Sequence, residues 1–282
     1  MNDLNLPSNH ASQLNTTIQD NVLTICMNKP KKLNGWTLNM MMAVKAAMKA
    51  GSDEPAVKAI VLTGEGAYYS AGVNLSSTIK LMHPRKLRDM IKEMNQDLFE
   101  LFLLCPKPLL VAFNGPAIGA SVTSATLCNA IMAAHSATFL LPFAALGVPP
   151  EGCSSVHLAR LIGKQNAQRM LGQEGWKPTA QEAHDAGLVQ HLVADEALRE
   201  EAQKLAKSWV DTEQPRQYMA GSTQKELLAV NERESMELAN AFLAPKFLHG
   251  QAKFLWGKGK FAPALMFYTL LLLRPLWALT LK

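Results

Sequence analysis

Short apolar runs alternate with amphipathic stretches over the first 150 residues of the chain. Apolar runs of the kind that form buried strands lie at residues 22–26, 59–64 and 108–115. Between the first two, Thr37 can cap a helix that Gly51 would stop. Apolar spacing predicts a second, longer helix after Pro84. This β-α-β alternation predicts an α/β protein with crossover connections.

Helical patterns dominate from about residue 150 onward. Residues 179–182 (T-A-Q-E) match a capping box closed by Gly187, and residues 196–210 and 222–243 predict two more helices. The sequence thus divides into an α/β core (1–195), a helical region (196–260) and an apolar C-terminal extension (261–282).

The composition fits an intracellular globular protein. Of the 282 residues, 48% are hydrophobic and 18% charged, which argues against long disordered segments. The cysteines are widely spaced, as expected of reduced and mostly buried thiols, and lie at Cys26, Cys105, Cys128 and Cys153. The histidines show no metal-ligand spacing, so no metal site is predicted.

Positive charge gathers near the C-terminus. The net charge is +5, yet no acidic residue follows Glu237, whereas six lysines and arginines do. Such a tail suits an anionic partner, either a CoA phosphate, another subunit or a membrane surface, although scattered solvating lysines would look the same. The polar N-terminus has no apolar segment of the kind found in signal peptides, and it lacks the arginines of a transit peptide.

The C-terminal extension begins with an apolar run. Residues 261–273 are followed by Arg274 and Pro275. A membrane-spanning helix needs roughly 20 apolar residues, and an arginine at its centre costs about 2.5 kcal/mol or more. We therefore expect a buried or subunit-facing helix in preference to a tail anchor or an interfacial helix.

Three segments could carry chemistry. Residues 63–75 form a glycine-rich turn after a strand, and residues 108–123 lead a buried strand into a helix near Gly119. Free N–H groups at such a helix start suit a partial negative charge, although both segments could serve packing alone. In the third segment, residues 146–157, Glu151 stands ahead of a helix in apolar surroundings. It could favour the helix dipole, or act as a base with a raised pKa.

Together these segments resemble the crotonase (enoyl-CoA hydratase/isomerase) superfamily, and the similarity runs from about residue 20 to about residue 260. Residues 27–34 (M-N-K-P-K-K-L-N) echo its L-N-x-x-x-K-L-N motif, and residues 70–75 (S-A-G-V-N-L) its S-A-G-x-[DN]-L signature. Residues 114–123 and 150–155 (P-E-G-C-S-S) resemble the peroxisomal-type Δ3,Δ2-enoyl-CoA isomerase branch. The resemblance implies a spiral of ββα units with a C-terminal helical region.

The resemblance also assigns expected roles to residues. The backbone N–H groups of Val73 and Ala120 would form an oxyanion hole for the thioester oxygen of an acyl-CoA. Because these donors belong to the main chain, valine and alanine are acceptable there. The implied substrate-binding positions are Ser70, Ala71, Gly72, Asn74 and Leu75.

Which reaction is implied depends on the carboxylates. The hydratase branch uses two glutamates that position a water, and Thr123 and Phe143 occupy those positions here. Neither can act as a base, so hydration is disfavoured. The isomerase branch has one glutamate where Glu151 stands. It would take a C2 proton from a 3-enoyl-CoA and return it to C4, giving the trans-2-enoyl-CoA with no cofactor besides the CoA thioester substrate.

Two departures from the family pattern affect these expectations. Asn74 replaces the usual aspartate of the signature. The isomerase branch commonly ends near a short lysine-containing peroxisomal address, and the similar K-G-K-F at residues 258–261 is followed by 21 more residues. Since such an address must be terminal, it is not intact, and a soluble protein in either the peroxisome or the cytoplasm is compatible with the sequence.

Other interpretations stay open. The chain could catalyse enoyl-CoA hydration or another crotonase reaction, for which a second acid would be needed. It could also be a non-catalytic module that binds acyl-CoA, or a partner through its basic tail. Family members are typically trimers or dimers of trimers, which implies a homotrimer or hexamer. No nucleic-acid partner is expected, and membrane contact of the tail is not favoured.

Overall fold

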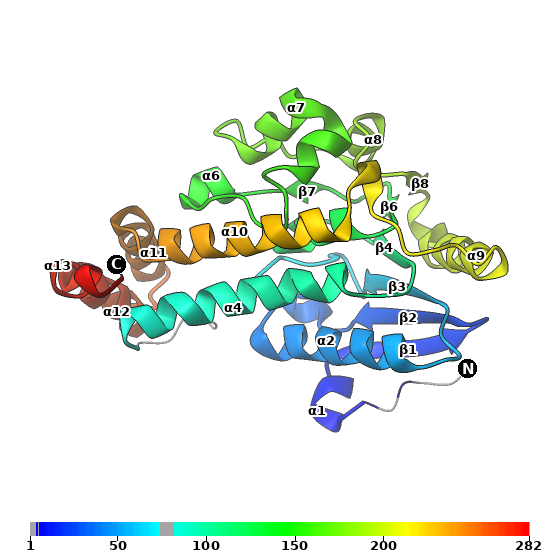
Figure 1. Cartoon of the computed structure of the whole chain (residues 1–282), viewed down its shortest axis with the longest axis horizontal. Coiled ribbons are helices and arrows are strands. Elements are labelled where there is room, and N and C mark those ends of the chain that lie inside the picture. Colours follow the sequence, from blue (N-terminus) through cyan, green and yellow to red (C-terminus); the bar gives the residue numbers. More distant parts are fainter. Residues whose placement is uncertain (1–3, 5, 74–81, 282) are drawn as a thin grey trace.

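The structure, a computed structural model, describes residue 4, residues 6–73 and residues 82–281. A six-stranded sheet lies at its centre, in the order β1-β2-β3-β4-β6-β8 (Figure 1). Only β1 runs antiparallel to its neighbour. The strands are β1 (Leu14–Gln19), β2 (Val22–Met27), β3 (Ala59–Gly64), β4 (Leu109–Phe113), β6 (Ala130–Ala134) and β8 (His191–Val193).

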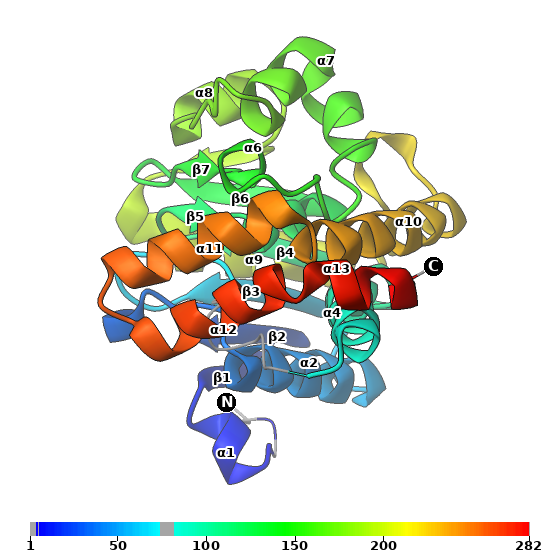
Figure 2. The same cartoon turned by 90° about the vertical axis from the view of Figure 1, so that its left-hand side faces the viewer.

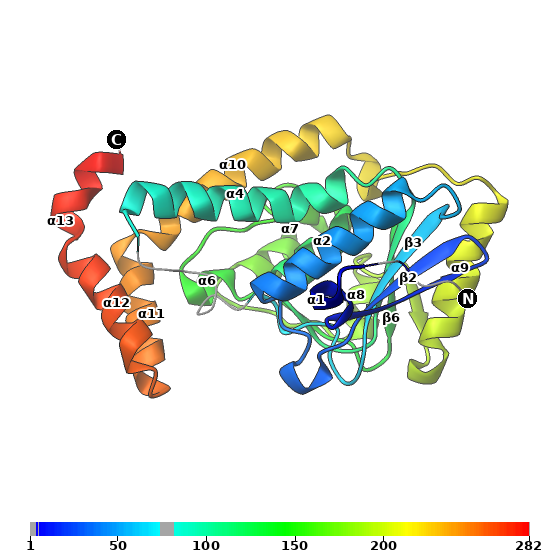
Figure 3. The same ribbon diagram turned by 90° about the horizontal axis from the view of Figure 1, so that it is seen from below.

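Helices cover the sheet and continue beyond one end of it (Figures 1 and 3). They are α1 (Ser8–Ala11), α2 (Leu38–Asp53), α4 (Pro84–Leu103), α5 (Ala120–Thr123), α6 (Phe143–Leu146), α7 (His157–Leu171), α8 (Ala180–Asp185), α9 (Leu198–Asp211), α10 (Gln224–Phe242), α11 (Pro245–Gly257), α12 (Phe261–Leu272) and α13 (Arg274–Trp277).

Helices bury both faces of the central sheet, and successive strand residues point to opposite faces. Leu23 and Ile60 belong to the core shared with α2 and α4. Val22 and Val61 are the sequence neighbours of these two residues, so they point to the other face, where they pack with α9. The predicted α/β class is therefore confirmed, with the strands at the predicted runs.

A second, smaller layer of strand pairings lies beside the sheet. There β5 (Ala117–Ile118) pairs in parallel with β7 (Phe139–Leu140). Isolated bridges join Trp36 to Val73 and Ser70 to Ala117. Successive turns of the chain thus contribute one strand to the sheet and one extended segment to this layer, and the layer carries the residues that form the site.

Most helix boundaries follow the sequence signals, with one exception. The Thr37 hydroxyl accepts a hydrogen bond from the Met40 N–H, as expected of the predicted cap. The capping box of α8 is also present. However, the predicted stop at Gly51 is wrong, because α2 continues to Asp53. A Cβ on Gly51 would lie 2.3 Å from Leu23 Cδ2, so this glycine serves close helix–sheet packing.

Helices α4 and α10 lie side by side along most of their length (Figures 1 and 3). Polar groups join them inside the protein. Asn95 Nδ2 donates to Ser235 Oγ at 3.0 Å, and Asn231 Nδ2 donates to the Gln96 carbonyl at 3.0 Å. These bonds fix α10 in register against α4, which matters because both helices line the site.

The C-terminal extension forms α12, which packs beside α11, and α13, which leads into a last turn (Ala278–Leu281) against α4 (Figure 2). Phe267 and Trp277 are buried in a cluster with Phe247 of α11. The opposite side is open to solvent, since Leu272 is 78% exposed and Leu276 74%. The predicted buried helix is thus confirmed for one face. Among the described helices, none is both long and apolar enough to cross a membrane.

We predict that truncation after Phe261 lowers stability and solubility, because it uncovers the apolar side of α11. As a matched pair, Phe267→Ala should cost about 3 kcal/mol or more of unfolding free energy, and Leu272→Ala less than about 0.5 kcal/mol. Urea unfolding measures the stability of the truncated chain and of the two variants, and sedimentation measures solubility and oligomer size. Unchanged solubility, oligomer size and stability of the truncated chain would contradict a structural role of the extension.

Candidate active site

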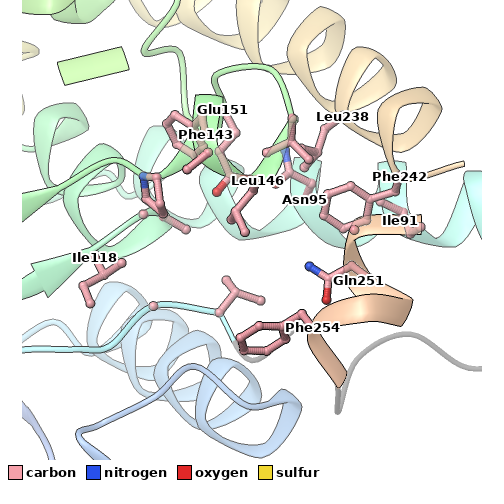
Figure 4. Close-up of a pocket in the computed structure, with 18 of the residues that line it drawn as sticks. Ile91, Asn95, Ile118, Phe143, Leu146, Glu151, Leu238, Phe242, Gln251 and Phe254 are labelled. Carbon is pink, nitrogen blue, oxygen red and sulfur yellow. The ribbon is translucent and has the colours of Figure 1, made fainter. Parts of the chain in front are cut away.

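A cavity of about 770 Å³ opens between the small strand layer and the helices α4, α10 and α11 (Figure 4). Its walls are mainly apolar, with Ile91 from α4, Leu238 and Phe242 from α10, and Phe254 from α11. The same cavity is bordered by Glu151 and by both segments predicted to form an oxyanion hole. The structure therefore brings together three stretches that are far apart in the sequence.

Gly72 allows two backbone segments to approach each other at the cavity. Its φ is +79°, a left-handed value that favours glycine. A Cβ there would lie 2.4 Å from the Ile118 carbonyl oxygen. The Ile118 N–H donates to the Ser70 carbonyl at 3.1 Å, and the Trp36 N–H donates to the Gly72 carbonyl at 2.8 Å. These contacts hold the segment before Val73 against the start of α5.

The predicted substrate-binding residues fall into three groups. Ala71 and Gly72 line the cavity. Ser70 is fully buried beneath the loop, where its hydroxyl donates to the Asn34 carbonyl at 2.9 Å and accepts from the Gly72 N–H at 3.1 Å. Ser70 thus shapes the turn that presents Val73. Asn74 and Leu75 lie outside the described residues.

Val73 and Ala120 both line the cavity. Ala120 is the first residue of α5, so its N–H has no partner within that helix. Within the described parts of the chain, neither N–H donates to any acceptor. Two such N–H groups beside one cavity can donate hydrogen bonds to a ligand oxygen that gains negative charge.

Glu151 lies in a tight turn at the cavity wall, half-buried, with its carboxylate directed into the cavity near Leu146 (Figure 4). Gly152, with φ +66°, makes this turn possible, since a Cβ there would meet Phe99 at 2.4 Å. Withdrawal from water raises the pKa of Glu151 to about 8, and the nearby carboxylate of Glu234 adds to the effect.

The alternative role for Glu151, as a partner of a helix dipole, is wrong. Helix α7 begins at His157, and its first turn contains no acidic residue. The dipole effect falls off within the first turn. The raised pKa and the open cavity instead match the requirements of a general base.

The two positions expected to hold glutamates in a hydratase are filled by side chains without acid–base function. Thr123 is fully buried and its hydroxyl donates to the Ala120 carbonyl at 3.4 Å. Phe143 is buried at the start of α6 and forms part of the cavity wall. Among the described lining residues, Glu151 is the one carboxylate.

The contributions of the long helices to the site were not predicted from the sequence. Asn95 of α4 borders the cavity, and Glu234 of α10 bonds to the turn that follows Glu151. A signal existed in α10, where Leu227, Glu234 and Leu238 share the buried side of the helix at helical spacing. Lys258 and Lys260, from the basic C-terminal stretch, also line the cavity.

Comparison with known proteins agrees with this architecture. The sequence model of the enoyl-CoA hydratase/isomerase family matches residues 17–252. The chain belongs to this family. A solved enoyl-CoA hydratase/isomerase structure from Pseudoalteromonas atlantica superposes with a TM-score of 0.74 at 26% identity, covering 87% of this chain and 97% of that one. The predicted crotonase-type fold is therefore confirmed.

Relatives within the family are named for different activities. Human enoyl-CoA delta isomerase 2 is 35% identical over 229 residues, which cover 80% of this chain and 56% of the human protein. The chain thus spans just over half the length of that relative. The 2,3-dehydroadipyl-CoA hydratase of Escherichia coli is 30% identical over 195 residues, covering 69% of this chain and 74% of that protein.

We predict that Gly72→Ala destabilises the fold by about 2 kcal/mol or more, because it adds a side chain at positive φ and pushes against the Ile118 carbonyl. Gly250→Ala is the matched control, since it lies within α11 with nothing within 4 Å of the added Cβ. That control should leave stability unchanged or slightly raised. Equal urea midpoints for the two variants would contradict the close approach.

Proposed function

We propose that this chain is a Δ3,Δ2-enoyl-CoA isomerase that converts a 3-enoyl-CoA into the trans-2-enoyl-CoA. The observation that carries the proposal is one carboxylate, Glu151, among the described residues of an apolar cavity. Val73 and Ala120 line the same cavity, and their N–H groups have no acceptor within the described part of the chain. Moving a double bond by one position requires one base and one site for the enolate oxygen. Adding water would require a second group to position the water.

The proposed reaction uses each group once. The Glu151 carboxylate takes the C2 proton, and the electron pair of that C–H bond moves toward the thioester carbonyl. The resulting dienolate oxygen accepts hydrogen bonds from the N–H groups of Val73 and Ala120. Glu151, now protonated, delivers the same proton to C4, so the double bond ends between C2 and C3. No atom is gained or lost, and the base returns to its starting state.

The surroundings of Glu151 suit proton abstraction from carbon. A carboxyl group of ordinary pKa is a weak base, whereas burial raises the pKa of Glu151 to about 8. The apolar wall formed by Leu238, Phe242 and Phe254 can receive an acyl chain. Lys258 and Lys260 can attract the phosphates of a CoA moiety. The human relative named as a delta isomerase supports the same activity.

We further propose that the chain assembles as a homotrimer or hexamer. The exposed leucines of the extension, among them Leu265 and Leu276, support an association surface. The truncation after Phe261 described above tests this assignment through the size of the assembly.

We predict that Glu151→Gln lowers turnover of cis- and trans-3-enoyl-CoA by about a thousandfold or more, because the amide cannot accept the proton. Thioester binding should remain, since the glutamine keeps the volume of the side chain. A coupled spectrophotometric assay measures turnover, and equilibrium binding of a saturated acyl-CoA measures affinity. Equal turnover by the unmodified chain and the Glu151→Gln variant would contradict the role of Glu151 as the base. Binding without turnover by the unmodified chain would favour a binding module.

The pH dependence gives an independent prediction. The base works when deprotonated, so kcat/KM should rise with pH, about tenfold per unit below pH 8, and level off above it. The measurement is kcat/KM in overlapping buffers from about pH 6 to pH 9.5. A flat profile over this range, as a carboxyl group of ordinary pKa would give, would show that Glu151 is not withdrawn from water in the working enzyme.

A further inference from the structure

A second buried carboxylate lies behind the turn that carries Glu151. Glu234, on α10, is 0% exposed. Its oxygens accept hydrogen bonds from the Cys153 N–H at 2.7 Å, the Ser155 N–H at 2.9 Å and the Ser155 hydroxyl. All these donors belong to the four residues that follow Glu151 in the chain.

The donors are of a kind that favours the ionised form of Glu234. Backbone N–H groups can only donate, so they favour the carboxylate over the protonated acid. Arg233 Nη2 donates to Ser155 Oγ at 3.1 Å, which leaves the hydroxyl hydrogen of Ser155 free to point at Glu234. A buried carboxylate without such partners would be strongly disfavoured.

The turn itself needs external support. Gly152 and Cys153 both have left-handed φ values, +66° and +64°. For cysteine this conformation is costly and persists only where surrounding contacts enforce it. Helix α10 supplies those contacts twice, because Glu234 accepts from the Cys153 N–H and the Leu227 carbonyl accepts from Cys153 Sγ at 3.2 Å.

We propose that Glu234 is a positioning residue for Glu151: it holds the turn that aims Glu151 into the cavity and sets a second negative charge behind it. The inference rests on the proposed function, in which Glu151 is the base. Glu234 does not border the cavity among the described residues, so it acts through Glu151 and not on the substrate.

The charge arrangement gives this role a measurable consequence. Burial is the first cause of the raised pKa of Glu151, and Glu234 is the second. Burial also raises the pKa of Glu234 to about 7, while the donors on Ser155 and Cys153 and the charge of Arg233 oppose the rise. From α4, the neutral Asn95 bonds to Ser235 and the apolar Phe99 packs behind Gly152, while the charged Lys92 pairs with Glu232 at 3.7 Å. Neutralising Glu234 should therefore lower the pKa of Glu151.

Glu234→Gln is the decisive variant, because it removes the charge while keeping nearly the same volume. We expect kcat to fall about tenfold or more with little change in KM, and the acid limb of kcat/KM to move to lower pH by about half a unit or more. Glu234→Asp keeps the charge but shortens the side chain. It should therefore lower kcat while the acid limb of the kcat/KM profile stays near its original pH. Glu237→Gln, one turn further along α10 and exposed, should change neither.

A substrate-free measurement separates this inference from the proposed function. Infrared difference spectra against Glu151→Gln follow the titration of the Glu151 carboxyl in each background. A lower titration point in the Glu234→Gln background supports the positioning role even if 3-enoyl-CoA is not turned over. An unmoved titration point together with an unchanged kcat overturns it, as does a fall in kcat that comes without any movement of the limb.

Ser155→Ala keeps the test available if Glu234→Gln does not fold. Ser155 is exposed, and its loss removes one donor from Glu234 without altering the helix. With fewer donors, Glu234 holds its own proton more readily, so the titration point of Glu151 should again move to lower pH. An upward or absent movement in this variant contradicts the proposal.

Discussion

The site depends on keeping one carboxylate away from water while leaving it facing an open cavity. The turn around Glu151 meets both demands, since Phe99 and Thr123 crowd Gly152 from behind and the cavity lies in front. A group held in this way has a raised pKa, so its protonation changes near neutral pH. The surrounding elements can be understood by how they maintain that balance, from the small strand layer to the two long helices.

Local signals predicted the parts of this structure that local forces determine. The strands and the cap at Thr37 follow from side-chain patterns within a few residues, and the helices after Pro84 and Thr179 begin where predicted. Glu151 was singled out from its immediate neighbours. The role of Glu151 as a base came from the family resemblance, because its position in the sequence alone was equally compatible with an interaction with a helix dipole.

Contacts between distant segments could not be predicted in this way. The hydrogen bond from the Cys153 N–H to Glu234 joins residues 81 positions apart, and it requires α10 to be in place beside the turn. Gly51 carried a stop signal that tertiary packing overrode, because Leu23 occupies the space a side chain would need. The sequence showed that residues 261–273 are apolar. Which of their side chains are buried and which are exposed depends on how α12 packs on α11.

The cavity is built from two parts of the chain with different duties. Glu151 and the donors at Val73 and Ala120 come from turns anchored in the strand layers, whereas Leu238, Phe242 and Phe254 come from α10 and α11. Substitutions in the second group alter the volume and shape offered to an acyl chain while leaving the first group untouched. The shape of the cavity can therefore diverge at these helical positions, as long as Glu234 of α10 keeps its hydrogen bonds to the turn that carries Glu151.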